Sequence, residues 1–180
     1  MTTADASSDS PGVADPHDPA VAGLLAQAVR LAVVNAAAGQ LPFAALVVRD
    51  GAVLATGVNT ALRDRDPVAH AEVEAVRAAC RALGTQHLTG ATLVSSCEPC
   101  AVCRAVAAVA GIARIVYAAP RELVPDLGHA GPLDTGDLLV RMQDALRETA
   151  PGHAVHVPVP GADEPFRRFL AAEATGEAGP

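Results

Sequence analysis

The chain has 180 residues, which suits one domain with a sizeable core and short tails. Half of the residues are apolar but only 2% are aromatic, so small aliphatic side chains must fill that core. Thirteen basic residues, all of them arginine, stand against twenty acidic ones, which gives a net charge of −7. Proteins that hold long nucleic acids display basic surfaces, so this composition favours a small-molecule substrate over a nucleic acid.

The sequence shows no sign of membrane insertion or secretion. No stretch of about twenty uncharged apolar residues predicts a membrane span. The N-terminus is acidic and polar, and it lacks the basic flank and apolar run of a secretory signal. The four cysteines do not form the spaced framework of a disulfide-rich protein. We therefore expect a soluble protein in the reducing cytoplasm.

The first predicted elements are a helix and a hairpin. Residues 1–17 contain SSDSPG and DPHDP, and we expect them to form a disordered leader. Asp18 can cap a helix that has Pro19 at its first position and continues to about residue 38. The segment FAALVVRDGAVLATGV, residues 43–58, predicts two strands joined by a turn at Asp50-Gly51.

The rest of the chain alternates helices and strands. Strand–helix–strand units favour parallel pairing, so the sequence predicts an α/β fold with a mixed five-stranded sheet between helices. The predicted domain covers residues 18–174, and residues 175–180 are expected to be a flexible tail. The predicted segments are a helix opened by His70, a strand at 91–96, a helix at 99–110, a strand at 112–118, a loop at 119–134, a helix at about 136–148, a strand at 153–159 and a helix at 163–174.

Three of the four cysteines lie within SSCEPCAVC, residues 95–103. Pro99 suits the first turn of a helix, which places Cys100 and Cys103 one above the other on the same helix face. A helix N-terminus favours negative charge, so we expect both thiols to ionise readily and to bind a metal. Cys97 precedes the helix and shares no face with them. Cys80 falls at an apolar helical position, so it is best explained as a core residue.

Two thiolates do not complete a zinc site, because catalytic zinc takes three protein ligands and structural zinc takes four. The chain has no second CxxC motif to supply the rest. His70 is the third ligand that the sequence favours, since it opens a helix and Glu72 follows two residues later. In a first turn, His70 can point at a metal while Glu72 reaches the same cavity. A carboxylate there can accept a proton from water and deliver it to a substrate nitrogen.

His70-Ala71-Glu72 followed by Pro99-Cys100-Ala101-Val102-Cys103 resembles the signature of the zinc-dependent nucleobase and nucleoside deaminase superfamily. Within it, DPVAHAEVEAVRAACRALG and TLVSSCEPCAVCRAVAAVAGIARIVYAA are most similar to the bacterial guanine deaminase branch. The resemblance covers roughly residues 20–170. It implies a cytidine deaminase-like three-layer α/β/α fold and a zinc ion (Zn2+) held by His70, Cys100 and Cys103. It also implies hydrolytic deamination of a small aminated base, guanine-like first, with Glu72 as the catalytic acid and base.

The resemblance further implies three substrate contacts. Phe43 occupies the position of a phenylalanine that stacks on the base, with a role in the core as the alternative. The Asn59 carboxamide can donate to and accept from a base edge, with a role in a turn as the alternative. The Ala71 N–H is expected to face the substrate. The sequence departs from the branch at Ala44, where glycine is common, and in the helix after Cys103, which lacks aromatic residues.

Other functions share parts of this pattern. Cytosine- or cytidine-directed deaminases and tRNA adenosine deaminases have the same catalytic residues, and the latter should bind RNA with a steep salt dependence. A zinc-stabilised binding module without turnover is a non-enzymatic alternative. Cys100-x-x-Cys103 could also be a thioredoxin-like redox pair, although that function leaves His70 and Glu72 without a role.

The C-terminal segment DEPFRRFLAAEA bears on assembly. It places Phe166, Leu170 and Ala171 on one side of a helix, with Phe169 beside them, and such a strip should be buried. In the guanine deaminase branch the C-terminal segment crosses to a partner subunit and helps close its active site. The resemblance therefore implies a homodimer. The alternative is that the strip covers the sheet of its own subunit.

Overall fold

The computed structural model describes residues 18–128 and 133–175. The predicted leader, residues 1–17, lies outside the described residues, and so does the predicted tail except Thr175, which ends the last helix. The elements are α1 (Pro19–Ala37), β1 (Ala44–Arg49), β2 (Ala52–Val58), α2 (Ala61–Asp64), α3 (Ala71–Leu83), β3 (Thr92–Cys97), α4 (Ala101–Val109), β4 (Arg114–Ala119), the 3-10 turn η1 (Arg121–Leu123), α5 (Leu133–Thr149), β5 (Ala154–His156) and α6 (Glu164–Thr175).

Five strands form a mixed sheet in the order β2-β1-β3-β4-β5, which confirms the predicted fold class. β1 pairs antiparallel with β2 and with β3, whereas β4 pairs parallel with β3 and with β5. The predicted turn joins β1 to β2. Asp50 and Gly51 both have a positive φ, 52° and 75°, and this left-handed backbone matches the twist of the two strands.

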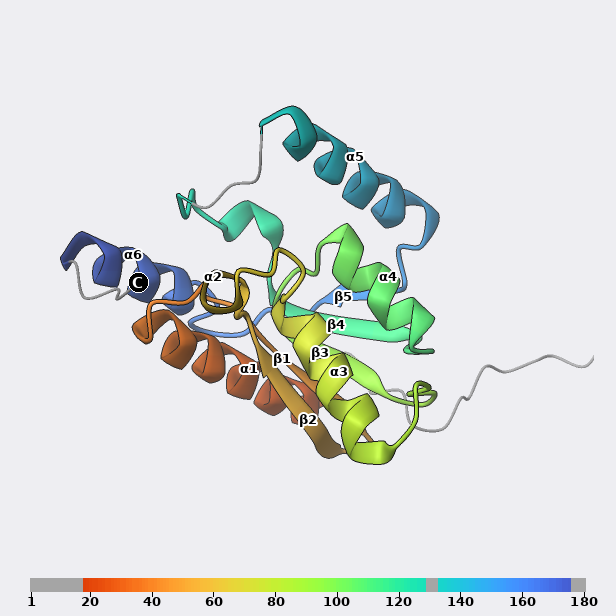
Figure 1. Cartoon of the computed structure of the whole chain (residues 1–180). Coiled ribbons are helices and arrows are strands. Elements are labelled where there is room, and N and C mark those ends of the chain that lie inside the picture. The colour runs from red at the N-terminus through yellow and green to blue at the C-terminus, as the bar shows by residue number, and fades with distance from the viewer. Residues whose placement is uncertain (1–17, 129–132, 176–180) are drawn as a thin grey trace, which may run out of the picture.

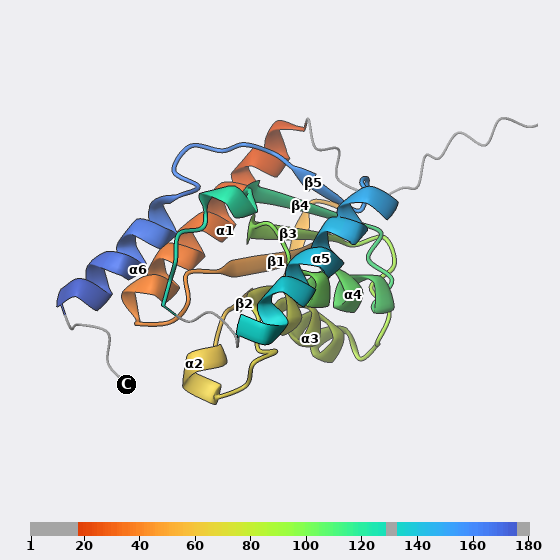
Figure 2. The ribbon, with the colours of Figure 1, turned by 90° about the horizontal axis from the view of Figure 1, so that it is seen from above.

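Helices cover both faces of the sheet and make three layers (Figure 1 and Figure 2). α1 and α6 lie side by side on one face, α3 and α4 cover the other, and α5 lies outside α4. Each face has its own apolar core. The core under α1 includes Leu25, Leu46 and Phe166, whereas the core under α3 and α4 is rich in alanine, including Ala75 and Ala107. These small side chains let the second pair of helices approach the sheet closely.

Helix α1 begins as predicted. Pro19 is its first residue, and the Asp18 carboxylate accepts a hydrogen bond from the Ala20 N–H at 2.8 Å. Among the described residues α1 alone is long and apolar enough to cross a membrane by length and composition. Its apolar side, which includes Val21 and Leu25, is buried in the core. Packing inside the domain accounts for the composition of this helix.

Several element boundaries differ from the prediction, and two of them are the start of α4 and the end of β5. α4 begins at Ala101 rather than at Pro99, because Cys100 is the N-cap and keeps an extended backbone with φ −67° and ψ 172°. β5 ends at His156 rather than near residue 159. Pro158 follows within two residues, and a proline cannot donate the N–H that a paired strand needs.

The buried face of α6 also differs from the prediction. Phe166, Phe169 and Ala172 are buried where α6 packs against α1, whereas Leu170 and Ala171 are exposed. The buried residues recur every three positions, so the strip includes Phe169 at its centre and turns Leu170 toward solvent. In this structure the C-terminal helix covers its own subunit.

Helix α3 lies in direct backbone contact with β2 at Gly57. A Cβ atom at this position would overlap the backbone oxygen of Ala71 and the backbone nitrogen of Ala75. Neither atom can move unless the first turns of α3 move with it. The absence of a side chain at Gly57 therefore determines how closely α3 approaches the sheet.

We expect Gly57→Ala to lower the free energy of unfolding by about 1 to 3 kcal/mol, because the added methyl group forces α3 away from β2. Gly23→Ala in α1 is the matched control. Nothing lies within 4 Å of a Cβ atom added there, and alanine favours a helix interior over glycine by about 1 kcal/mol. Denaturant unfolding of both variants should show shifts in opposite directions. An unchanged midpoint for Gly57→Ala would contradict the close contact.

Candidate metal centre

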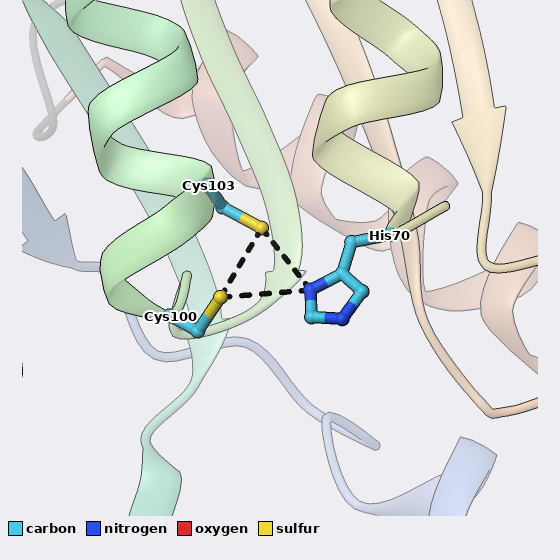
Figure 3. A group of neighbouring side chains, drawn as sticks. All are labelled: His70, Cys100 and Cys103. Atoms are coloured by element: carbon cyan, nitrogen blue, oxygen red, sulfur yellow. Dashed lines mark hydrogen bonds between the residues drawn. The ribbon is translucent and has the colours of Figure 1, made fainter. Parts of the chain in front are cut away.

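The N-termini of two helices meet beside the carboxyl end of β3. His70 is the N-cap of α3 and Cys100 is the N-cap of α4. The parallel β3–α4–β4 connection places the start of α4 at the carboxyl end of β3, and α3 packs beside α4. Figure 3 shows the His70 ring pointing from one helix toward Cys100 and Cys103 on the other.

The three side chains bring one nitrogen and two sulfur atoms together. His70 Nδ1 lies 3.5 Å from Cys100 Sγ and 3.4 Å from Cys103 Sγ, and the two sulfur atoms are 3.5 Å apart. A tetrahedral zinc ion with ordinary bond lengths separates such ligand atoms by about 3.5 to 3.8 Å. The donor set and its spacing therefore fit zinc with three protein ligands and one position for another molecule.

The two thiols differ in protonation. The hydrogen bond with Cys103, together with that with His70, outweighs burial and lowers the pKa of Cys100 to about 4. The same bond with Cys100, together with burial, raises the pKa of Cys103 well above its usual range. The prediction that both thiols ionise readily is therefore wrong for Cys103 when only the charges of the protein itself act on it. A second anion so close to the first is stabilised by a divalent cation rather than by a helix N-terminus.

Glu72 reaches the same site from the first turn of α3. Its buried carboxylate accepts a hydrogen bond from Ser95 Oγ to Oε1 at 2.9 Å, and Oε2 lies 3.3 Å from Cys103 Sγ. Burial, and then the negative charge of Cys100, raise the pKa of Glu72. A carboxyl group with a raised pKa can both accept and return a proton near neutral pH. Sequence analysis missed Ser95, because every residue of β3 is buried and no alternation marks the side that faces Glu72.

The other two cysteines lie apart from this cluster, as predicted. Among the described residues, the group whose ligand atoms come together consists of His70, Cys100 and Cys103. Cys97 is buried at the end of β3, and burial raises the pKa of its thiol, which disfavours the thiolate that binds metal. Cys80 packs against the core under α3.

The predicted substrate contacts lie on two adjoining segments and at the start of α3. Phe43 precedes β1 and packs against both cores, with its ring centroid 6.0 Å from that of Phe166. Asn59 follows β2 and is buried; its N–H donates to the Phe43 carbonyl at 3.0 Å, and its Oδ1 accepts from the Ala61 N–H at 3.1 Å. Ala71 is the first residue of α3, so its N–H has no acceptor within the helix.

Glu98, two residues before Cys100, could be expected from the sequence to lie in solvent or to cap a helix, but the structure buries it against α5. Its side chain is 2% exposed, and it accepts hydrogen bonds from Gln143 at 3.1 Å and from Arg147 at 2.7 Å, both on α5. The N–H of Arg121 donates to it at 3.2 Å. Burial opposes ionisation, but these bonds outweigh it and hold the pKa of Glu98 below its usual value. α5 is thereby connected to the segment that carries the first cysteine of the site.

Comparison with known proteins agrees with this geometry. Residues 22–119 match the cytidine and deoxycytidylate deaminase zinc-binding region. Guanine deaminase of Bacillus subtilis is 45% identical over 114 residues, which are 62% of this chain and 67% of that protein. A tRNA-specific adenosine deaminase of Agrobacterium fabrum is 41% identical over 80 residues, which are 44% of this chain and 53% of that protein. The chain thus spans two thirds of the first relative and about half of the second.

A solved structure shares the fold over most of the chain. The protein NE0047, in complex with 2,6-diaminopurine, has a TM-score of 0.65 and 26% sequence identity, over 88% of this chain and 83% of that one. The three-layer fold expected from the resemblance is therefore confirmed. The matched zinc-binding region contains His70, Glu72, Cys100 and Cys103. The chain belongs to the cytidine and deoxycytidylate deaminase family, with zinc as its cofactor.

Proposed function

We propose that this protein removes ammonia by hydrolysis from a small aminated nucleobase, with a guanine-like base as the first candidate. The observation that carries the proposal is the meeting of Glu72 with His70, Cys100 and Cys103 at two helix N-termini. The similarity to the guanine deaminase of Bacillus subtilis supports the choice of base. The 2,6-diaminopurine complex of NE0047 supports a purine in the same fold.

The proposed reaction depends on a proton carrier fixed beside the metal. His70, Cys100 and Cys103 would hold the zinc, which would lower the pKa of a bound water to about 7 and so supply the nucleophile for the carbon bearing the amine. Glu72 accepts a proton from the attacking water and gives one to a ring nitrogen. A second proton passes from the added hydroxyl through Glu72 to the amine, and the carbon–nitrogen bond breaks as ammonia leaves. Ser95 holds Oε1, so Oε2 is the oxygen that carries the proton.

We place the base against three groups around the metal. Ala71 donates its free N–H to the substrate, the Phe43 ring stacks on it, and the Asn59 side chain contacts its edge. The contact from Ala61 occupies Asn59 Oδ1, which leaves Nδ2 as the donor toward the base. A hydrogen bond connects the segment after Asn59 to the metal site: the Thr60 N–H donates to the backbone carbonyl of Ala69, the residue before His70, at 3.0 Å.

The alternatives differ in what they require of the site. Cytosine- or cytidine-directed and tRNA adenosine deaminases use the same catalytic groups, and the relative from Agrobacterium fabrum supports the RNA-directed alternative. The net charge of −7 favours a small molecule over RNA. A redox function does not require a histidine 3.4 Å from Cys103 Sγ or a carboxylate 3.3 Å from the same atom. A binding module without turnover does not require the buried carboxyl group of Glu72, which is not one of the three metal ligands.

We also propose that the enzyme is a homodimer in the cytoplasm. Reduced thiols are needed for the metal site, which suits that compartment. An apolar groove of about 590 Å³ lies between α3, α4 and α5, and its lining extends to Ala101 and Val102 beside the cysteines of the metal site. Val109 beside it is 83% exposed, and Met142 on α5 is 47% exposed. Apolar surface of this extent favours contact with a second copy of the chain.

An assay of ammonia release against guanine, adenine, cytosine and their nucleosides, with metal content measured on the same sample, tests the function. We expect about one zinc per chain and turnover of guanine above the other compounds. Glu72→Gln keeps the size of the side chain but cannot carry a proton, so turnover should fall by at least about a hundredfold while zinc stays bound. Normal turnover in Glu72→Gln would exclude this residue as the acid and base.

The ligand assignment predicts different effects for the four cysteines. Cys100→Ser and Cys103→Ser should lose most of the bound zinc, because each removes one of three protein ligands. Cys80→Ala and Cys97→Ser are the controls, and each should keep its zinc. Metal analysis of the four purified variants measures the difference. Full zinc occupancy in Cys100→Ser would refute the assignment.

The assembly can be tested with single substitutions, since deletion of α6 would expose its buried phenylalanines. Val109→Glu places a charge beside the apolar groove and is expected to convert the dimer into monomers, as measured by light scattering during gel filtration. Leu170→Glu is the matched control on the exposed side of α6. Monomers from Leu170→Glu alone would move the interface to the C-terminal helix. A monomeric wild-type protein would refute the homodimer.

A further inference from the structure

A buried asparagine in α1 carries the inference. The buried residues of α1 are apolar with the exception of Asn35, which is 7% exposed in the last turn of the helix. A buried amide costs stability unless it is hydrogen-bonded. The Nδ2 atom of Asn35 donates to the carbonyl of Leu41 and to the carbonyl of Asn59, both at 2.8 Å. One side chain therefore joins two segments that lie 18 residues apart in sequence.

The two segments joined by Asn35 are those that carry the proposed substrate contacts. Leu41 lies two residues before Phe43, and its carbonyl also accepts from the Phe43 N–H at 2.8 Å. The Phe43 carbonyl accepts from the Asn59 N–H at 3.0 Å. The bonds form a closed loop through Asn35, Leu41, Phe43 and Asn59. This loop determines the position of Phe43 relative to Asn59.

The catalytic groups depend on other elements. His70 and Glu72 belong to the start of α3, Ser95 to β3 and the two cysteines to the start of α4. Asn35 contacts none of them in its hydrogen bonds to Leu41 and Asn59. Loss of its side chain should therefore affect the positions of Phe43 and Asn59 while the metal site stays assembled.

We propose that Asn35 is a positioning residue that determines substrate affinity by holding Phe43 and Asn59 at a set separation. The inference rests on the proposed function, in which these two side chains contact the base. It adds a residue from the opposite face of the sheet that touches neither metal nor substrate. Its effect is on binding of the base and not on the chemical step.

Asn35→Leu keeps the side-chain volume and removes both donated hydrogen bonds. We expect the KM for guanine to rise by about tenfold or more, with kcat within about threefold of wild type and about one zinc per chain. Val29→Ala, a buried change six residues earlier in the same helix that removes no hydrogen bond, is the matched control. It should lower the unfolding temperature and leave KM unchanged. A KM for Asn35→Leu equal to that of the control would overturn the proposal.

Amide hydrogen exchange tests whether Asn35 holds the two segments without any need for turnover. On zinc-loaded protein free of substrate, the Asn59 N–H should exchange at least about tenfold faster in Asn35→Leu than in wild type or Val29→Ala. Unchanged exchange overturns the proposal whatever the substrate is. If the wild-type protein releases ammonia from no base, the proposed function is contradicted. The exchange result alone then decides whether Asn35 holds the two segments.

Discussion

The backbone contact between Gly57 and the first turns of α3 is the constraint on which the active site depends. It lets α3 lie against β2 with no side chain between them, next to the alanine-rich core on that face. The first residues of α3 supply one metal ligand, His70, and the buried acid Glu72. A shift of α3 would separate both groups from the cysteines at the start of α4, because α4 follows a different strand, β3.

The site brings several ionisable groups together in a largely buried environment, and hydrogen bonds from neighbouring side chains stabilise them. Glu72 receives a hydrogen bond from Ser95, while Cys100 forms hydrogen bonds with His70 and Cys103. Two thiolates and a carboxylate so close together require positive charge, which the zinc of this family supplies. The same acidic surroundings keep Glu72 able to hold a proton, because burial and the Cys100 charge both raise its pKa.

Helix α5 is attached to the domain largely through polar contacts at its C-terminal half. The buried Arg104, next to Cys103, donates to the carbonyls of Leu146 and Ala150 at 3.0 and 2.8 Å. Arg147 pairs with Glu98 beside Cys100. Both ends of the short segment that carries the cysteines thus contact α5. The apolar residues of α5 remain partly exposed, so the polar contacts, rather than a core, hold this helix in place.

Local patterns in the sequence determined the elements and the metal ligands: the Asp18 cap, the Asp50-Gly51 turn, and the spacing that puts Cys100 and Cys103 on one helical turn. Such features depend on residues close together in the chain. Only the tertiary structure decided the partners of Ser95, Glu98 and Asn35, which lie 23, 49 and 24 residues away. It also decided which face of α6 is buried. A buried polar group takes whichever partner the packing brings near, and no short segment of sequence contains that information.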